Sequence, residues 1–231
     1  MMRRLPILLL AMLAISPALA QTAAKAAVMP DLFRRAMIPA APVSQLYAYD
    51  FFEQSQGDRA GTVRGHVDPS RPKGARVTIT EANGERVDLK KIDERHENEA
   101  DGNIWCDQLS NGVDGPISEI GRTEAGRVFA FTPKAKPTAK AEEKTLYKQL
   151  AAQVAIDDAA AIRTFHAKLT KPWKPMLLAK LTNVQMTGAC LTAPNGRAYA
   201  ARLSMTFQGS AMGSDFSQAM TRTITNLTPT G

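Results

Sequence analysis

Two cysteines carry the most definite chemistry in this chain. Cys106 and Cys190 are its only thiols, and they do not form a Cys-x-x-Cys pair, the spacing that lowers a thiol pKa for redox catalysis. In an oxidising compartment, two distant cysteines most simply form one structural disulfide. We therefore predict a Cys106–Cys190 bridge. Two buried free thiols, or a bond to a partner protein, are the alternatives.

An acidic stretch before Trp105 has the oxygen-rich side chains that hard cations bind. Carboxylates and an amide alternate at Glu97, Glu99, Asp101 and Asn103. This spacing resembles the calcium loop of the EF-hand and dockerin families, and the resemblance implies a calcium site. The stretch departs from the family pattern because it begins with glutamate rather than aspartate and has glutamine in place of the bidentate glutamate. We favour the simpler interpretation, a solvated acidic turn without a metal.

Sequence motifs of the common enzyme classes are missing. His66, His96 and His166 form no close metal-binding pair, and neither a Walker loop nor a Rossmann glycine pattern occurs. Residues 209–213 place a serine one position too early for a nucleophile elbow, so we interpret them as a turn or bulge between strands. We therefore expect a protein without a cofactor that is not an enzyme. Histidines lying apart from carboxylates would strengthen that expectation.

Methionines are frequent in the last third of the chain, and methionine suits both irregular cores and adaptable apolar grooves. Core packing is the simpler explanation, and a copper site would need several thioethers or histidines close together. The second explanation is an apolar groove between sheet and helix, for which we name Met186, Met205 and Phe207. By analogy of fold alone, periplasmic lipoprotein carriers hold acyl chains between a curved sheet and its helices.

The first twenty residues have the pattern of a secretory signal peptide. Arg3 and Arg4 precede an apolar stretch, which ends in a small-residue cleavage site at Ala20. The apolar stretch is shorter than the roughly 20 residues of a membrane-spanning helix, and we expect no transmembrane segment after cleavage. The sequence therefore predicts a periplasmic or secreted protein.

The charge balance argues against nucleic acid as a partner. Without the signal peptide the chain has 27 basic and 22 acidic residues, a net charge of +5. Nucleic-acid binding usually needs a more concentrated basic face. For an exported protein we expect an envelope lipid, a polysaccharide or a protein as the partner. The lysines of 134–148 could contact phosphates, although a solvated linker is the simpler interpretation.

Composition divides the chain into five segments. The charged and proline-rich connector at 133–144 is the best candidate boundary, and the disulfide is expected to join the parts on its two sides into one unit. The segments are a signal peptide (1–20), an Ala/Pro-rich N-terminal arm (21–43), a β-rich part (44–132), the connector (133–144) and a helix followed by antiparallel strands (145–231).

The hydrophobic pattern predicts an α+β fold, in which an antiparallel sheet carries one main amphipathic helix and short additional helices. The main helix is expected over residues 142–156, because Leu146, Leu150 and Val154 lie four apart. Ser44 is a plausible N-cap for a short helix over 45–54.

Three further local patterns concern the middle of the chain. An Asn-Gly dipeptide at 83–84 predicts a β-hairpin, and the charged residues 90–103 are expected to be solvated. Residues 127–132 alternate as a strand does.

Together the features of the sequence predict an exported, non-enzymatic binding or envelope-associated protein. A structural or interaction component of the envelope is the first alternative, and a hydrolase with a site of dispersed residues is the second.

Overall fold

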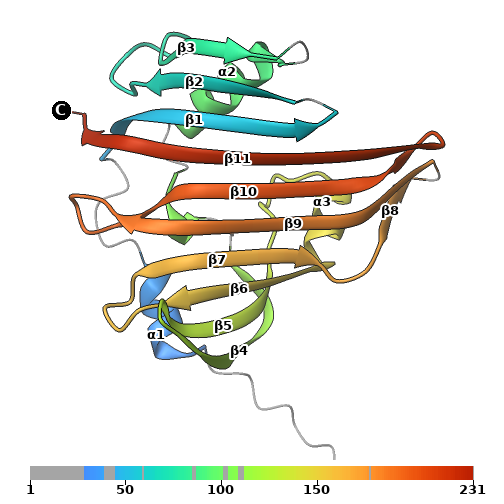
Figure 1. Ribbon diagram of the computed structural model, residues 1–231. Helices are drawn as coiled ribbons and strands as arrows, with labels where there is room; N and C mark the ends of the chain where they lie inside the picture. Colours follow the sequence, from blue (N-terminus) through green and yellow to red (C-terminus); the bar gives the residue numbers. More distant parts are fainter. Residues whose placement is uncertain are drawn as a thin grey trace, which may run out of the picture.

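The computed structural model describes residues 29–38, 45–58, 60–84, 87–100, 104–108, 112–176 and 178–230. Within these residues eleven strands form one antiparallel sheet (Figure 1). The strands are β1 (Tyr47–Gly57), β2 (Gly61–Val67), β3 (Val77–Asn83), β4 (Val113–Thr123), β5 (Gly126–Pro133), β6 (Leu150–Ile156), β7 (Ile162–Leu169), β8 (Trp173–Met176), β9 (Ala179–Thr192), β10 (Ala198–Ala211) and β11 (Ser214–Pro229). The helices are α1 (Asp31–Ala36), α2 (Leu89–Glu99), α3 (Ala141–Tyr147) and the single 3-10 turn η1 (Cys106–Gln108).

The strand order makes one continuous sheet from both halves of the chain. It runs β3-β2-β1-β11-β10-β9-β7-β6-β5-β4, and β8 pairs beside β9. The first strand pairs with the last, from Tyr47 opposite Pro229 to Gly57 opposite Gln218. Strands β3 and β4 are the open edges. Two register shifts interrupt the pairing of β4 with β5, and such irregular edges resist pairing with another chain.

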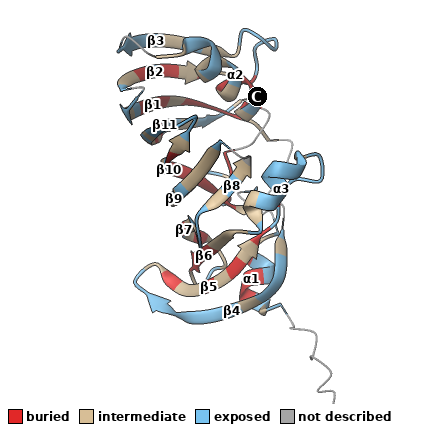
Figure 2. Cartoon of the chain, turned by 90° about the vertical axis from the view of Figure 1, so that its right-hand side faces the viewer, coloured by how far each residue is buried: buried red, intermediate tan, exposed pale blue. Residues whose placement is uncertain are grey.

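Directly paired residues share a face of a sheet, so the register defines which side chains lie together. One line across the sheet, here called the methionine row, consists of Ser55, Met220, Met205, Met186, Ala167, Ala152 and Phe131. The neighbouring line on the same face runs from Glu53 through Arg222 and Leu203 to Phe129. All three helices lie on this side of the sheet (Figure 2), which we call the helix face.

Two apolar clusters cover separate parts of the helix face. Helix α1 fills one of them, where the fully buried Phe33 makes edge contacts with Phe129 and Phe131, at ring-centroid distances of 5.8 and 5.3 Å. The other cluster lies under α2 and includes Tyr49 and Trp105. Hydrophobic burial at these two places supplies the main driving force for covering the sheet.

The predicted disulfide is confirmed, and it lies between the two clusters. Cys106 bonds to Cys190 of β9 and packs in the α1 cluster, while Trp105 packs in the α2 cluster. The guanidinium of Arg197 lies 4.6 Å from the centre of the Trp105 ring, and it donates two hydrogen bonds of 2.6 Å to Asp107. Residues 104–108 therefore form a cross-linked plug on the helix face, over the end of β9 and the start of β10.

The expected α+β fold is wrong. The chain is mostly antiparallel sheet with three short helices, and the expected main helix over 142–156 is divided between α3 and strand β6. A spacing of four residues suits a helix and also a strand, because four is twice the strand period. Leu150, Ala152, Val154 and Ile156 alternate along β6, and this period-two pattern prevails.

Two other local predictions are also wrong. Residues 47–54 lie in β1 rather than in a helix, because Tyr47, Tyr49 and Phe51 alternate toward the core. The Asn83–Gly84 dipeptide does turn the chain, with Gly84 at φ +125°, but α2 follows it instead of a second strand. By contrast, the strand predicted at 127–132 is present as β5.

The described residues contain no helix that is both long and apolar enough to cross a bilayer. The predicted signal peptide at 1–20 and its predicted cleavage site lie outside the described residues, as does most of the arm at 21–43. The part of the arm that is described contains α1, with Leu32 and Phe33 buried in the core.

Breaking the disulfide is expected to destabilise the fold strongly. The bond closes a loop with a sequence separation of 84. Closing a loop of that length lowers the conformational entropy of the unfolded chain and thereby stabilises the folded state by about 4 kcal/mol. Urea unfolding followed by circular dichroism should show this loss in a Cys106→Ala/Cys190→Ala variant, and in the native protein when reductant is added. Reductant should leave the variant unchanged. Equal unfolding midpoints for oxidised and reduced native protein would contradict the prediction.

Candidate functional site

A groove opens between α2 and the sheet, with a volume of about 270 Å³. Its floor is made by Met205, Phe207, Met220 and Gln218 of β10 and β11. The floor residues are half-buried rather than covered. The remaining lining comes from β1, β2, α2 and the residues just before α2: Glu53, Ser55, Gly61, Val63, Val87, Asp88, Lys91, Ile92 and Arg95.

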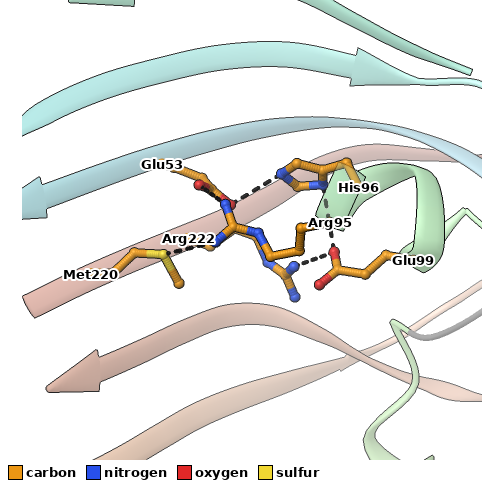
Figure 3. A network of polar contacts seen from close by, with 6 residues as sticks. All are labelled: Glu53, Arg95, His96, Glu99, Met220 and Arg222. Carbon is orange, nitrogen blue, oxygen red and sulfur yellow. Dashed lines mark hydrogen bonds and ion pairs between the residues drawn. The ribbon is translucent and has the colours of Figure 1, made fainter. Parts of the chain in front are cut away.

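One end of the groove adjoins a buried network of charged side chains (Figure 3). His96 of α2 is fully buried, and its Nε2–H donates to Glu53 Oε1 at 3.0 Å, since an ionised carboxylate only accepts. Arg95 of α2 pairs with the other oxygen of Glu53, and its second amino group lies 3.4 Å from the sulfur of Met220. The network thus joins the helix to the sheet directly beside the apolar floor.

The same network continues to β11. Glu99, at the end of α2, pairs with the buried Arg222, and the Nδ1 of His96 lies 3.5 Å from a Glu99 oxygen. The imidazole ring of His96 also stacks on Phe51, with 3.7 Å between ring centres. Two carboxylates and two guanidinium groups therefore balance one another around a single imidazole.

The electrostatics favour the charged forms of Glu53 and Arg222 despite their burial. Burial alone would raise the pKa of Glu53, but the hydrogen bond from His96 and the positive charge of Arg95 outweigh it, so the pKa lies below its usual value. Burial likewise opposes the charge of Arg222, and the carboxylate of Glu99 more than offsets this, which raises the arginine pKa. The neighbouring hydroxyl of Tyr49 is buried, and burial raises its pKa.

Helix α2 forms where local capping favours it, although few of its residues are apolar. The side chain of Asp88 accepts a hydrogen bond from the backbone N–H of Lys91 at 3.2 Å, which caps the first turn. Ile92 is one of the few apolar contacts to the cluster below. The expectation that 90–103 is solvated is therefore wrong for His96 and Glu97, which are buried.

The three residues predicted for an apolar groove lie on the helix face. Met205 and Phe207 line the groove under α2. Met186 is the direct register partner of Met205 but lines an adjoining cavity of about 40 Å³, which α1-cluster residues surround. The charged residues of the network were missed. One signal was available, because Glu53 continues the alternation of Tyr47, Tyr49 and Phe51.

The residues of the predicted calcium loop divide into two groups. Glu97 and Glu99 lie in the last turn of α2. Glu97 Oε1 accepts a hydrogen bond of 2.8 Å from the backbone N–H of Arg76, and Glu99 is engaged with Arg222. Asp101 and Asn103 lie outside the described residues. Across the described ranges, no three His, Cys, Asp or Glu side chains are grouped as metal ligands would be.

Two of the three histidines lie close to carboxylates. The structure therefore does not strengthen the expectation that the protein is not an enzyme. Besides His96, the half-exposed His66 has its Nδ1 2.7 Å from Asp50 Oδ1, and Asn226 donates to the other oxygen of Asp50 at 2.7 Å. His66 lines neither the groove nor the adjoining cavity. His166 lies near Gln185, at 3.4 Å.

Comparison with known proteins leaves the fold and site to be interpreted from the chain itself. Searches with protein-family models, curated proteins and solved structures find no match.

Replacing Glu53 by Gln is expected to lower the free energy of unfolding at neutral pH by about 3 kcal/mol, because it leaves Arg95 and His96 without their carboxylate. The lowered pKa of Glu53 stabilises the fold at pH values above the usual carboxyl pKa, and this contribution is lost as pH falls through the lowered value. The native protein should therefore lose its advantage over Glu53→Gln in acid. Urea unfolding at several pH values measures both effects.

Glu81→Gln is the matched control, because it removes an exposed carboxylate 3.3 Å from Arg64. Exposed pairs of this kind contribute about 1 kcal/mol or less. Equal losses for the two variants would show that the buried network does not stabilise the docked helix.

Proposed function

We propose that this protein is an exported binding protein that holds the apolar part of a small amphipathic envelope molecule, such as a single acyl chain, in the groove under α2. The observation that carries the proposal is the half-buried apolar floor formed by Met205, Phe207 and Met220. A folded protein usually covers such a surface, and concave apolar sites with a few polar groups are typical of ligand sites.

The volume and lining of the groove support a slender ligand. Its volume of about 270 Å³ lies at the lower limit of small-molecule pockets, which usually have about 300–1,000 Å³. Methionines adapt their shape to varied apolar ligands. Lys91 and Arg95 line the α2 side, so a polar or anionic group attached to the apolar part would find donors there.

The disulfide supports the exported location, because such bonds persist in oxidising compartments. With the signal-peptide pattern of residues 1–20, it favours the periplasm or the cell exterior as the place of binding. The His66–Asp50 pair does not favour an enzyme, because it lines none of the described cavities where a substrate could lie.

A fluorescent apolar probe, 1-N-phenylnaphthylamine, is expected to bind the native protein, and decanoate should displace it. Phe207→Asp should weaken probe binding at least tenfold, because it places an unpaired charge in the apolar floor. The control is Gln208→Asp, which adds the same charge at the next position of β10, where the side chain is exposed on the opposite face. Unchanged binding to Phe207→Asp, or equal losses in the two variants, would contradict the proposal.

A further inference from the structure

A basic pocket lies on the connector and α3, apart from the groove. It has a volume of about 350 Å³ and is lined by residues of the connector, α3 and the end of β5. Four lysines line it, and Asp114 is its single carboxylate: Lys134, Lys136, Lys144 and Lys148. All four lysines are exposed. Among the described residues none of their ammonium groups is in an ion pair, which leaves a local excess of positive charge.

The basic pocket and the groove open at the same end of the sheet. Phe131 and Met205 belong to the methionine row. Two residues further along their strands come Pro133, which lines the basic pocket, and Phe207, which lines the groove. Four strand spacings of about 4.8 Å separate β5 from β10, so the two sites lie roughly 20 Å apart on the helix face.

Exposed apolar side chains lie at this end as well. Leu178 precedes β9 and Met212 lies in the turn between β10 and β11, and their side chains are 64% and 84% exposed. A backbone hydrogen bond of 2.8 Å from Met212 to Leu178 holds the two residues next to each other. Strand β8 pairs with the start of β9 and contacts α3, so the same edge connects these residues to the basic segment.

We propose that this end of the sheet, with the four lysines, Leu178 and Met212, is a docking surface for an anionic phospholipid bilayer. The lysines lie against headgroup phosphates, and the two apolar side chains enter the interfacial region. The groove then opens toward the membrane.

A bilayer fits this surface better than a free phosphate ion does. The lysines are exposed and spread over fifteen residues of sequence, so no compact set of buried donors surrounds one small anion. An extended anionic surface can contact all of them at once. The exposed Leu178 and Met212 have no role in binding a free phosphate, whereas both gain by leaving water at a membrane.

Vesicle co-sedimentation tests the proposal with the full mature chain. The native protein should bind vesicles of phosphatidylglycerol and phosphatidylcholine, but not phosphatidylcholine alone, and added salt should weaken the binding. The variant Lys136→Gln/Lys144→Gln/Lys148→Gln should bind about a hundredfold more weakly, since each lysine near an anionic bilayer changes binding about fivefold. Leu178→Asn should bind about tenfold more weakly.

Matched controls separate position from composition. Lys73→Gln/Lys90→Gln/Arg202→Gln removes the same charge from exposed cations elsewhere, and Leu191→Asn changes a 55% exposed leucine near the far end of β9. Both controls should bind vesicles as the native protein does. Equal losses in variants and controls would overturn the proposal, as would inorganic phosphate displacing the protein more than chloride at equal ionic strength, or binding to an anionic polysaccharide alone.

This inference stands apart from the proposed groove function. The lysine variant should bind the soluble apolar probe with native affinity, because none of its substituted residues lines the groove. Loss of vesicle binding with intact probe binding would support the docking surface alone.

Discussion

A buried set of charges joins α2 to the sheet and borders the groove. The helix has few apolar residues to bury, so hydrophobic packing contributes less to its docking than it does for α1, where Leu32 and Phe33 enter the core. Glu53 and Arg222 of the sheet supply the opposite charges instead. Buried ion pairs are costly to desolvate, and removing one partner leaves the other charge buried and unpaired. The network therefore joins α2 to the sheet directly beside the half-buried floor.

The fold was only partly predictable because several of its patterns satisfy two periods. The strand pattern of 127–132 was clear, and so was the disulfide, since two cysteines allow a single pairing. The spacing of Leu146, Leu150 and Val154 fits a helix as well as it fits a strand. The apolar Ala152, between Leu150 and Val154, indicated strand β6. In β1 the aromatic alternation is present in the sequence, but Leu46, Tyr49 and Phe52 are also spaced as one face of a helix would be.

The charged network could not be predicted from local sequence patterns, because its members lie far apart in the chain. His96 lies 43 positions from Glu53, and Glu99 lies 123 positions from Arg222. Nothing within the segment 90–103 indicates that partners from two strands will neutralise it, so the segment reads as solvated. The apolar floor was easier to foresee. Met205 and Phe207 share a face by the strand period alone, and the pairing of β10 with β9 brings Met186 beside them.

The two ends of the helix face differ, and this difference organises the functional surface. Toward the end where β9 finishes and β10 begins, the disulfide, Trp105 and the Arg197–Asp107 pair cover the face. Such a cross-linked plug cannot move aside without exposing a buried indole and separating a buried ion pair. At the opposite end no comparable segment among the described residues lies over Phe207 and Gln218, and the chain there presents the groove, the lysines and Leu178. A molecule bound in the groove therefore lies at the end of the helix face that carries the membrane-compatible side chains.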